Sequence, residues 1–526
     1  MTLSTLNKLT KSPNLLIDFN SVKKRLESTL QTLFQRLNNQ TWSGTQYSTA
    51  YDTAWGASFQ KHHKKPYFPQ AIQWLLNNQH YDGSWGSDVR ETIAERMLST
   101  ATVLGTLLQY DFSNDIIDKG FDWLHNNFKN INSLGTKFTR TAGFELLFPS
   151  MLKRLSQKDL ENRLNINFEP ILRLQEEKLS RLPLQQILLS KTPVVHSLEF
   201  LEGIDRQIPS LDIHIGRNNS LGCAPSTTAW YANQNPRTKP GLIHYLKRTQ
   251  HFDGGWPAFT DYELMNIPFV IYPLSQALGY IPEQFTPILQ RLYNKWTPLG
   301  IGFSEYFEVS DADNTALGLL CLYKQHLIHS DKRFWQSIEL YENNEYFNTY
   351  PFEIEPSLMV NLHVLDLFQN VTNHPRSQTI IDKLYAYFDS KMKNGTLPGD
   401  KYHFSPSFQN CHGILTFANR AHDLAEKCFQ YFERTQNSNG LWGIENTQVE
   451  ETSFAVLALS NYHKLIEPID LNNLLLAVEY LIMNWNSRYA EQWTSKIFHS
   501  PTEMIQAHIF AALASYAKVR GMNVSF

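Results

Sequence analysis

The stretch Gln79-His-Tyr-Asp-Gly83-Ser-Trp85 is the first of three related segments that decide the fold of this 526-residue chain. The other two read Gln250-His-Phe-Asp-Gly254-Gly-Trp256 and Gln436-Asn-Ser-Asn-Gly440-Leu-Trp442. A helical segment precedes each one, and the Gly supplies the positive φ that ends a helix. The Trp then folds back over that end, and the Gln amide bonds the freed backbone groups. We interpret these units as structural clamps, whose recurrence predicts helical hairpins stacked into a closed toroid.

Helical periodicity dominates the rest of the chain. Apolar residues recur at three- and four-residue spacing, most clearly over 116–128, 315–327, 356–367, 451–465 and 471–483. We find no convincing run of alternating strands with tight hairpin turns. The sequence therefore predicts an all-α protein, and its length predicts two or three domains.

The composition excludes several classes of protein. Hydrophobic residues make up 42% and charged residues 18% of the chain, as in soluble globular proteins. The net charge of −3 includes no long basic block, so we expect no nucleic-acid partner. We expect neither a signal peptide nor a transmembrane helix. The 4 scattered cysteines do not form a disulfide framework, which predicts reduced thiols and a cytoplasmic location.

The aromatic content leaves two interpretations open. Phe, Trp and Tyr make up 13% of the chain. Large hydrophobic cores account for this share. A cavity walled by aromatic faces also accounts for it, and such faces attract a cation that passes along a hydrocarbon.

Further short motifs stand around the three repeats. In chain order they are Ser48-Thr-Ala-Tyr-Asp52-Thr-Ala-Trp55, Gly143-Phe-Glu-Leu-Leu-Phe-Pro149, Val195-His196-Ser-Leu-Glu199, Pro225-Ser-Thr-Thr-Ala229, Ser310-Asp311-Ala312-Asp313-Asn314-Thr315-Ala316, Asn361-Leu-His363-Val-Leu365 and Asp400-Lys-Tyr-His-Phe-Ser-Pro406. This ordered set resembles the class II terpene cyclases, which include squalene–hopene cyclases and copalyl diphosphate synthases. The resemblance runs from about residue 45 to 460 and is specific as a set, although any single motif is weak.

The resemblance implies two α-helical double-barrel domains, called β and γ, with the substrate between them. The γ domain is inserted after the first helix of β, and we expect it over residues 41–279. The β domain is then expected over 1–40 plus 280–526. The chain is too short for the extra helical domain of the plant enzymes, and no transit-like leader is evident. Both features favour a bacterial-type diterpene cyclase. No Asp-Asp-x-x-Asp motif occurs, so class I ionisation chemistry is unsupported.

Class II cyclases start their reaction by protonating a carbon–carbon double bond. Their Asp-x-Asp-Asp motif maps onto this chain so that Asp313 is the implied proton donor and Asp311 its electrostatic neighbour. Such a donor must stay protonated in a dry pocket, and a nearby carboxylate helps by raising its pKa. Asn314 replaces the usual last aspartate, but its amide can still donate to a carboxylate. Taken alone, Ser310 and Asp311 read equally as a helix N-cap.

Four further residues are candidates for helping the acid or ending the reaction. Ser357 and Asn361 resemble the pair that hydrogen-bonds the family's catalytic acid, with ordinary helix polarity as the alternative. His196 and Asp253 stand at the positions of a His and an Asn that form the base group in copalyl diphosphate synthases of the ent series. A His–Asp pair can remove a proton directly or through a water. A structural histidine and a turn aspartate are the alternatives.

The candidates for substrate binding are mainly cations. Lys178 resembles a lysine that binds diphosphate in the plant enzymes. Lys137 and Arg140 stand where an acidic Mg²⁺ motif is expected, so they bind the anion directly or belong to a solvated loop. Mg²⁺ is therefore a possible cofactor whose ligands the sequence does not identify. Trp256 is a candidate aromatic contact for the substrate.

The leading hypothesis is cyclisation of geranylgeranyl diphosphate to a copalyl-type bicyclic diphosphate. Farnesyl diphosphate or a prenylated aromatic is the alternative substrate. A protein prenyltransferase β subunit shares the toroid but needs a Zn²⁺ site with Asp, Cys and His ligands, and Asp313 stands where its Cys is required. A non-catalytic helical scaffold also stays open. The expected partner is an isoprenoid small molecule, and the oligomeric state is not predicted.

Overall fold

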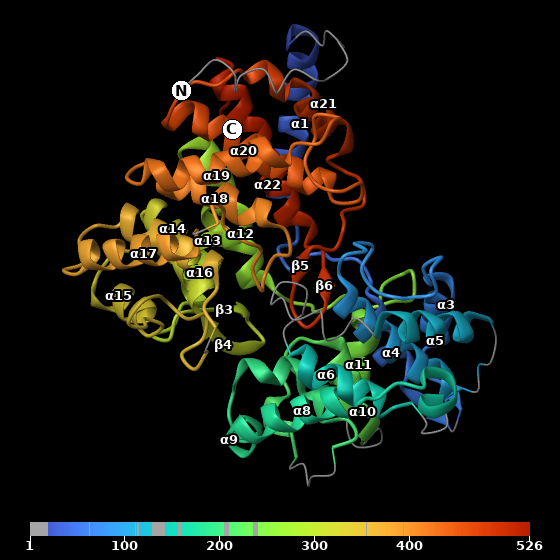
Figure 1. The fold of residues 1–526 in the computed structure, drawn as a ribbon. Helices are drawn as coiled ribbons and strands as arrows, with labels where there is room; N and C mark the ends of the chain where they lie inside the picture. The colour runs from blue at the N-terminus through green and yellow to red at the C-terminus, as the bar shows by residue number, and fades with distance from the viewer. Residues whose placement is uncertain are drawn as a thin grey trace.

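The computed structural model describes residues 19–526, apart from 63, 111, 113–114, 129–142, 156–158, 205–209, 235–239, 354 and 393. Nearly all of the regular secondary structure in this part is helical, and the helices form two groups that meet at a junction (Figure 1). The predicted all-α fold with two helical toroids is therefore confirmed. In the described part of the chain, no helix combines the length and hydropathy needed to cross a bilayer.

The first group, the N-terminal toroid, is built from the segment between α2 and α11. Its inner elements contact one another in turn and close into a ring: α2 (Ala50–Ala57), α4 (Ile93–Leu108), α6 (Phe144–Leu152), the 3₁₀-helix η4 (Pro193–Leu201) and α10 (Pro225–Gln234). Each inner element carries an outer helix: α3 (Pro69–Asn77), α5 (Asp115–Phe128), α8 (Glu169–Arg181), α9 (Leu184–Leu189) and α11 (Pro240–Thr249). The shorter elements are β1 (Gln60–His62), β2 (Lys65–Pro66), η3 (Leu160–Leu164) and η5 (Asp212–His214).

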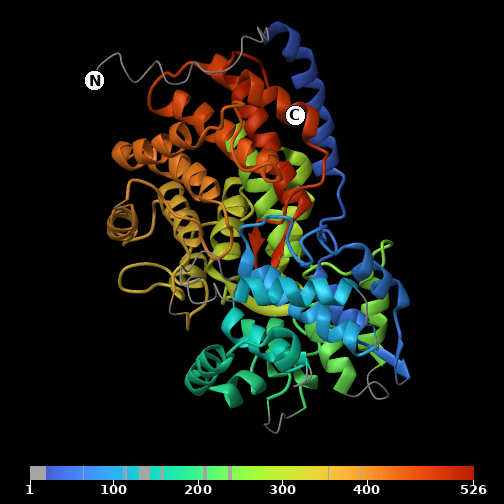
Figure 2. The same cartoon turned by 45° about the vertical axis from the view of Figure 1, so that its right-hand side comes forward.

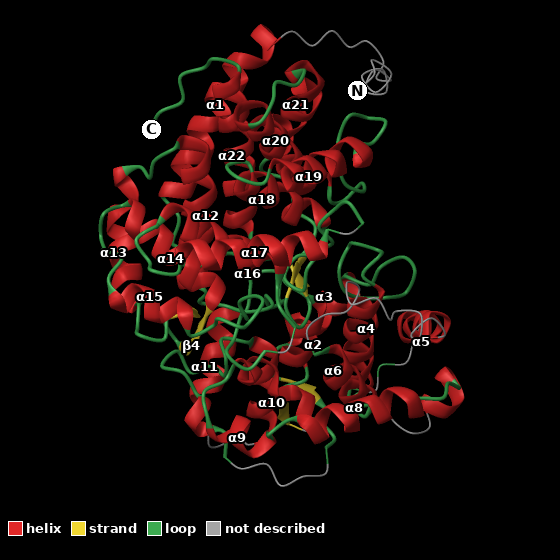
Figure 3. Cartoon of the chain, turned by 60° about the vertical axis from the view of Figure 1, so that its left-hand side comes forward, coloured by secondary structure: helices red, strands yellow, loops and turns green. Residues whose placement is uncertain are grey.

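The second group, the C-terminal toroid, also contains the first helix of the chain (Figures 2 and 3). Its inner ring is α12 (Glu263–Leu278), α14 (Ala312–Lys324), α16 (Leu358–Asn370), α18 (Pro406–Phe417), α20 (Gln448–Leu465) and α22 (Thr502–Val519). The outer helices are α1 (Phe19–Asn38), α13 (Thr286–Lys295), α15 (Lys332–Glu339), α17 (Ser377–Lys391), α19 (His422–Thr435) and α21 (Leu475–Asn484). The short helices η6 (Glu283–Phe285) and η7 (Leu471–Leu474) connect them.

The end of the inserted domain differs from the expected position. Helix α12 (Glu263–Leu278) packs against α22 and α14, so it closes the inner ring of the C-terminal toroid. Its residues are apolar on nearly every side, as expected for a helix with neighbours all round. We therefore propose that the inserted domain ends before Glu263 rather than at residue 279.

Two hairpins near the junction were not expected from the sequence. Strands β3 (Ile301–Ser304) and β4 (Phe307–Asp311) pair antiparallel, with Ile301 opposite Asp311. Strands β5 (Trp493–Thr494) and β6 (Phe498–His499) also pair antiparallel, and they lie where the two toroids meet (Figure 1). Strands this short carry too few residues for their alternation to be recognised in a sequence.

The repeated clamps form as predicted. In each one the Gln Nε2 donates to the carbonyl of the Gly, at 2.8 Å for Gln79, 2.8 Å for Gln250 and 3.1 Å for Gln436. Each Trp Nε1 donates to a helix carbonyl ten residues earlier, from Trp85 to Leu75, Trp256 to Leu246 and Trp442 to Phe432. The three glycines, Gly83, Gly254 and Gly440, have φ of 94°, 95° and 79°. The clamp interpretation is confirmed.

Candidate active site

The predicted acid motif begins where β4 ends and α14 starts. Asp311 is the N-cap of α14, and its Oδ1 accepts a hydrogen bond from the backbone N–H of Asn314 at 2.8 Å. The Nδ2 of Asn314 donates to the Oδ2 of Asp311 at 2.6 Å. The capping interpretation of Asp311 is therefore confirmed. The side-chain amide of Asn314 therefore hydrogen-bonds Asp311 and not Asp313.

Asp311 is a carboxyl group with an unusual pKa. It is 4% exposed, and this burial raises its pKa to about 7. The charge of Asp313 acts in the same direction, whereas the hydrogen bonds from Asn314 oppose it. Near neutral pH, Asp311 is therefore protonated in part of the molecules. A protonated neighbour removes the repulsion that two carboxylates in a small volume would otherwise feel.

Asp313 forms a pair with a histidine from the adjacent inner helix. The Nδ1 of His363, in α16, lies 2.5 Å from the Oδ1 of Asp313, in the first turn of α14. The side chains are 13% exposed for Asp313 and 2% exposed for His363. The Nε2 of His363 is buried and has no hydrogen-bond partner. The pair is therefore a polar contact in a largely dry environment.

This geometry suits a carboxylic acid that gives up a proton. When Nδ1 of His363 carries a proton, it donates to Oδ1 of Asp313. No described group hydrogen-bonds the Oδ2 of Asp313, so that oxygen is available to carry the acidic proton. A hydrogen bond that strengthens as the carboxylate forms stabilises the product of proton transfer. His363 is thus placed to help Asp313 act as an acid.

The two residues expected to hydrogen-bond Asp313 have other partners, and that expectation is corrected. Ser357 is the N-cap of α16, and its Oγ donates to Asp400 Oδ2 at 2.5 Å. Asn361 exchanges hydrogen bonds with the backbone of Phe347, with its Oδ1 accepting at 2.8 Å and its Nδ2 donating at 2.9 Å. Both side chains are fully buried and hold the loops before α16. His363, two residues after Asn361, contacts Asp313 in their place.

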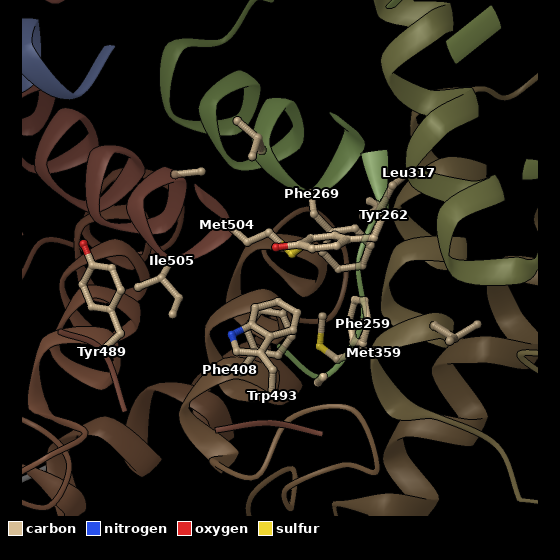
Figure 4. Close-up of a cluster of buried hydrophobic side chains, with 14 of the residues drawn as sticks. Phe259, Tyr262, Phe269, Leu317, Met359, Phe408, Tyr489, Trp493, Met504 and Ile505 are labelled. Carbon is tan, nitrogen blue, oxygen red and sulfur yellow. The ribbon is translucent and has the colours of Figure 1, made fainter. Parts of the chain in front are cut away.

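Aromatic rings surround the acid pair. The ring centroid of His363 lies 5.5 Å from that of Tyr272 and 5.8 Å from that of Phe269, both in α12. Phe269 lies 6.0 Å from Trp493 of β5. Figure 4 shows the buried hydrophobic cluster to which Phe269 and Trp493 belong, together with Met359, Phe408 and Met504. Part of the high aromatic content therefore lies beside the acid, where ring faces can stabilise a cation.

A lysine from the C-terminal toroid joins the two toroids. Lys496, in the β5–β6 turn, is 2% exposed, and its Nζ lies 2.7 Å from Oε1 of the fully buried Glu199 in η4. The same Nζ donates to Ser226 Oγ at 2.5 Å and to the carbonyl of His196 at 2.8 Å. Asp52 of α2 accepts from the backbone N–H of Ser226 at 3.2 Å. Residues from three of the short sequence motifs thus form one buried polar site that binds Lys496.

The predicted His196–Asp253 base pair does not form, which is a second correction. The Nδ1 of His196 lies 2.8 Å from the carbonyl oxygen of Gly222. Asp253 is exposed and accepts hydrogen bonds from Ser48 Oγ at 2.9 Å and from Trp74 Nε1 at 3.1 Å. The Oδ1 of Asp253 also accepts from the backbone N–H of Gly255 at 2.9 Å, so the turn interpretation is correct and both carboxylate oxygens have partners. Burial lowers the pKa of His196 to about 3, and the charge of Lys496 adds to the effect.

The structure bears differently on each residue predicted to contact the substrate. Trp256 is fully buried, donates to Leu246 and packs on Phe68, so the expected substrate contact is corrected to a clamp role. The Nζ of Lys178 lies 3.3 Å from Oε1 of Glu145 in α6, and its side chain is 44% exposed. Lys137 and Arg140 lie outside the described residues, and the structure does not test their predicted roles.

Metal ligands are not evident in the part of the chain that the structure describes. No three His, Cys, Asp or Glu side chains there are grouped so that they could hold a metal ion. The expectation of Mg²⁺ therefore finds no supporting ligand set among these residues. The cysteines Cys223, Cys321, Cys411 and Cys428 are all buried free thiols, as predicted.

Sequence reasoning missed three residues of this region. His363 lies in the Asn361–Leu365 motif, from which no role for it was inferred. The sequence feature that could have indicated a role is its position two residues after Asn361 on an apolar helix. Lys496 and His499 stand in a two-strand hairpin that has no recognisable periodicity. Only the packing of the two toroids brings these two residues to the site.

Comparisons with known proteins identify related diterpene cyclases. No family model matches the chain. The type B diterpene cyclase of Mycobacterium tuberculosis is 26% identical over 496 residues, which cover 89% of this chain and 95% of that protein. Ent-copalyl diphosphate synthase 2 of Isodon eriocalyx is 30% identical over 303 residues, which cover 56% of this chain and 37% of that protein. The chain thus spans little more than a third of that plant relative.

A solved structure shows the same fold. The ent-copalyl diphosphate synthase from Streptomyces platensis superposes with a TM-score of 0.74 at 22% identity, over 94% of this chain and 99% of that one. An agreement over nearly the whole of both chains covers both toroids and the junction between them. In sequence motifs, in overall similarity and in fold, this chain resembles the class II terpene cyclases.

Proposed function

We propose that this chain is a class II terpene cyclase, which protonates a carbon–carbon double bond of a linear isoprenoid and so starts its cyclisation. The observation that carries the proposal is the contact between Asp313 and His363 in a buried aromatic surrounding. The end-to-end similarity to a mycobacterial diterpene cyclase supports the same reaction.

The proposed reaction begins at Oδ2 of Asp313. Its proton forms a new C–H bond at one alkene carbon, which leaves a tertiary carbocation on the other. Two of the remaining double bonds then attack the cation in turn and close the two rings of a bicycle. The hydrogen bond from His363 stabilises the carboxylate left behind, and the faces of Phe269 and Trp493 stabilise the moving positive charge. Loss of one proton at the end makes the product an isomer of the substrate.

Geranylgeranyl diphosphate is the proposed substrate, and a copalyl-type bicyclic diphosphate is the proposed product. The names of the relatives from Mycobacterium tuberculosis and Isodon eriocalyx support a diterpene of this kind. Lys178, Lys137 and Arg140 are proposed to bind the head group, with or without Mg²⁺. Burial of all four cysteines as free thiols supports a cytoplasmic location.

The test uses purified protein and a panel of substrates. Geranylgeranyl diphosphate, farnesyl diphosphate and a geranylgeranylated benzoate are each incubated with Mg²⁺ and with EDTA, and the products are analysed by mass spectrometry. We expect a bicyclic isomer from geranylgeranyl diphosphate with the unmodified protein and none with Asp313→Ala. Asp389→Ala is the matched control, because Asp389 is 68% exposed and pairs with Lys427 at the surface.

The outcomes separate the hypotheses. A cyclised product from another member of the panel would support the proposed reaction type but identify a different substrate. No cyclised product from any substrate, or an unchanged product from Asp313→Ala, would reject the proposed function. The comparison with EDTA decides whether Mg²⁺ is required.

A further inference from the structure

The β5–β6 hairpin places two ring side chains on one face at the junction of the toroids. Trp493 and His499 are directly paired across the two strands, and paired residues of an antiparallel hairpin point to the same side. The turn between them carries Lys496, whose ion pair with Glu199 ties the hairpin to the N-terminal toroid. The position of His499 is therefore set by both toroids.

His499 is a buried polar side chain with no partner. It is 3% exposed, and neither Nδ1 nor Nε2 has a hydrogen-bond partner. Its ring packs edge-to-face on Phe259, with 4.9 Å between the ring centroids. A buried polar group without a partner destabilises a protein, so an unsatisfied histidine at a domain junction indicates a site for a ligand.

His499 also stands at the far end of a row of rings that begins at the acid. Asp313 contacts His363, whose ring lies 5.8 Å from Phe269. Phe269 in turn lies 6.0 Å from Trp493, the strand partner of His499. A hydrocarbon lying along this row would be protonated at its end near Asp313. The part of it that cyclises last would then lie near His499.

A second histidine faces the same aromatic ring. His196 lies 5.8 Å from Phe259 between ring centroids, so Phe259 contacts both His196 and His499. His196 has its Nδ1 committed to the carbonyl of Gly222, whereas both nitrogens of His499 are uncommitted. Because a carbonyl oxygen can only accept, that Nδ1 carries the proton and the Nε2 of His196 keeps a lone pair, so each histidine has a nitrogen able to accept a proton.

The charge state of His499 agrees with such a role. Burial lowers the pKa of His499 to about 3, the backbone at Ile497 opposes this effect, and the nearby His196 and His403 add to the lowering. A neutral imidazole does not repel a carbocation, and it keeps a bare lone pair. A C–H bond beside a carbocation is far more acidic than an imidazolium ion, so a weak base is sufficient to remove its proton.

We propose that His499, with His196 beside it, ends the cyclisation by taking a proton from the last carbocation. The C–H bond next to the cationic carbon breaks, its electron pair forms the new C=C bond, and the proton passes to a ring nitrogen of His499. The proton removed balances the one that Asp313 supplied. This inference rests on the proposed function, since it assigns the last step of the same reaction.

The decisive variant is His499→Phe. Phenylalanine keeps the packing on Phe259 and removes no hydrogen bond, so we expect unchanged or higher thermal stability. We expect geranylgeranyl diphosphate to be consumed still, while the share of the original product falls at least about tenfold. A product that has captured water, or one with a shifted double bond, replaces it. His374→Phe is the matched control, because His374 is also buried, at 8% exposed, but lies in the loop between α16 and α17 and pairs with Glu339 at 3.0 Å.

Each result bears on the inference separately from the proposed function. Failure of the unmodified protein to cyclise any isoprenoid rejects the proposed function. The original product from His499→Phe, formed at any rate, overturns the role of His499 and leaves the role of Asp313 intact. Loss of substrate consumption in folded His499→Phe also overturns it, because termination follows protonation. If His499→Phe does not fold, His499→Gln is tested instead, and its substrate consumption and products are judged by the same criteria.

Discussion

The Nδ1 atom of His363 lies 2.5 Å from Oδ1 of Asp313, although the two residues are 50 positions apart in the chain. The contact exists because α14 and α16 are neighbours in the inner ring of the C-terminal toroid. It gives the acid a hydrogen-bond donor from a second helix, where the family resemblance had pointed to Ser357 and Asn361.

Replacing His363 by Phe should slow the chemical step. The carboxylate formed on Asp313 loses a charge-assisted hydrogen bond worth about 1.5–3 kcal/mol, so we expect kcat to fall roughly 10- to 150-fold. KM should change little, because the histidine acts on the acid. Steady-state kinetics on geranylgeranyl diphosphate measure both values, with His374→Phe as control. An unchanged kcat would remove His363 from the acid's machinery.

Asp313→Asn should abolish turnover without unfolding the protein. The amide has nearly the same shape but cannot donate a carboxylic proton, so we expect a loss of about 10²–10⁴-fold or more in kcat. Thermal unfolding should stay close to that of the unmodified protein. Asp389→Asn controls for the loss of a surface carboxylate. Retained turnover by Asp313→Asn would refute the assignment of the acid.

Lys496→Met should destabilise the protein strongly. Removing one member of a buried ion pair leaves the charge of Glu199 uncompensated, and we expect a loss of about 3–5 kcal/mol in the free energy of unfolding. Lys191→Met is the matched control, since Lys191 makes an exposed ion pair with Glu308 across the same junction and should cost less than about 1 kcal/mol. Urea unfolding measures both.

A further variant separates charge from packing at that pair. Adding Glu199→Gln to Lys496→Met removes the unpaired charge, so part of the lost stability should return. A double variant no more stable than Lys496→Met would contradict the role given to the ion pair.

Asp311 should make stability depend on pH. Its pKa in the folded protein is about 7, above the ordinary value of 3.8, so the folded state holds this proton more tightly. The resulting stabilisation is complete below pH 3.8 and is lost as the pH rises through about 7. It amounts to about 4 kcal/mol at most.

The measurement for Asp311 is urea unfolding at several pH values between 4 and 8. Asp311→Asn cannot ionise, and we expect the difference in unfolding free energy between the two proteins to shift with pH in the direction given above. Asp331→Asn, at the N-cap of α15, controls for the loss of a capping carboxylate. A constant difference across this range would contradict the raised pKa of Asp311.

His196→Ala should change the product. His196 packs against Phe259 and Phe303 at the far end of the row of rings, so its loss opens space near the last carbocation. We expect part of the product to become hydroxylated by entering water, as detected by mass spectrometry. Phe252→Ala is a control, because Phe252 is fully exposed. A product mixture identical to that of the unmodified protein would remove His196 from the site.

Local features of this protein were predictable from the sequence. The Gln, Gly and Trp of each clamp act within ten residues, and Asp311 caps a helix that begins at the next residue. Helical periodicity predicted the segments that became α5, α14, α16, α20 and α21. These features depend on backbone conformation and on hydrogen bonds between near neighbours, which short stretches of sequence encode.

Residues that act across the chain were harder to assign. Asp253 matched a motif position, yet hydrogen bonds from Gly255 of its own clamp and from Ser48 and Trp74 hold it at the surface. His499 carried no local signal, and the signal for His363 was only its place two residues after Asn361, since a lone histidine on an apolar element is usually structural. Their roles depend on which side chains the neighbouring elements present.

The sequence by itself determined the helical toroids, the clamps that close them and the acidic cap that contains Asp313. Only the tertiary structure decided that His363 would be the partner of Asp313, and that Lys496 would reach Glu199 across 297 positions. The physical reason is the range of the interactions. Caps and turns are settled by neighbours in the chain, whereas a buried ion pair or an acid–base contact forms only after both rings have packed.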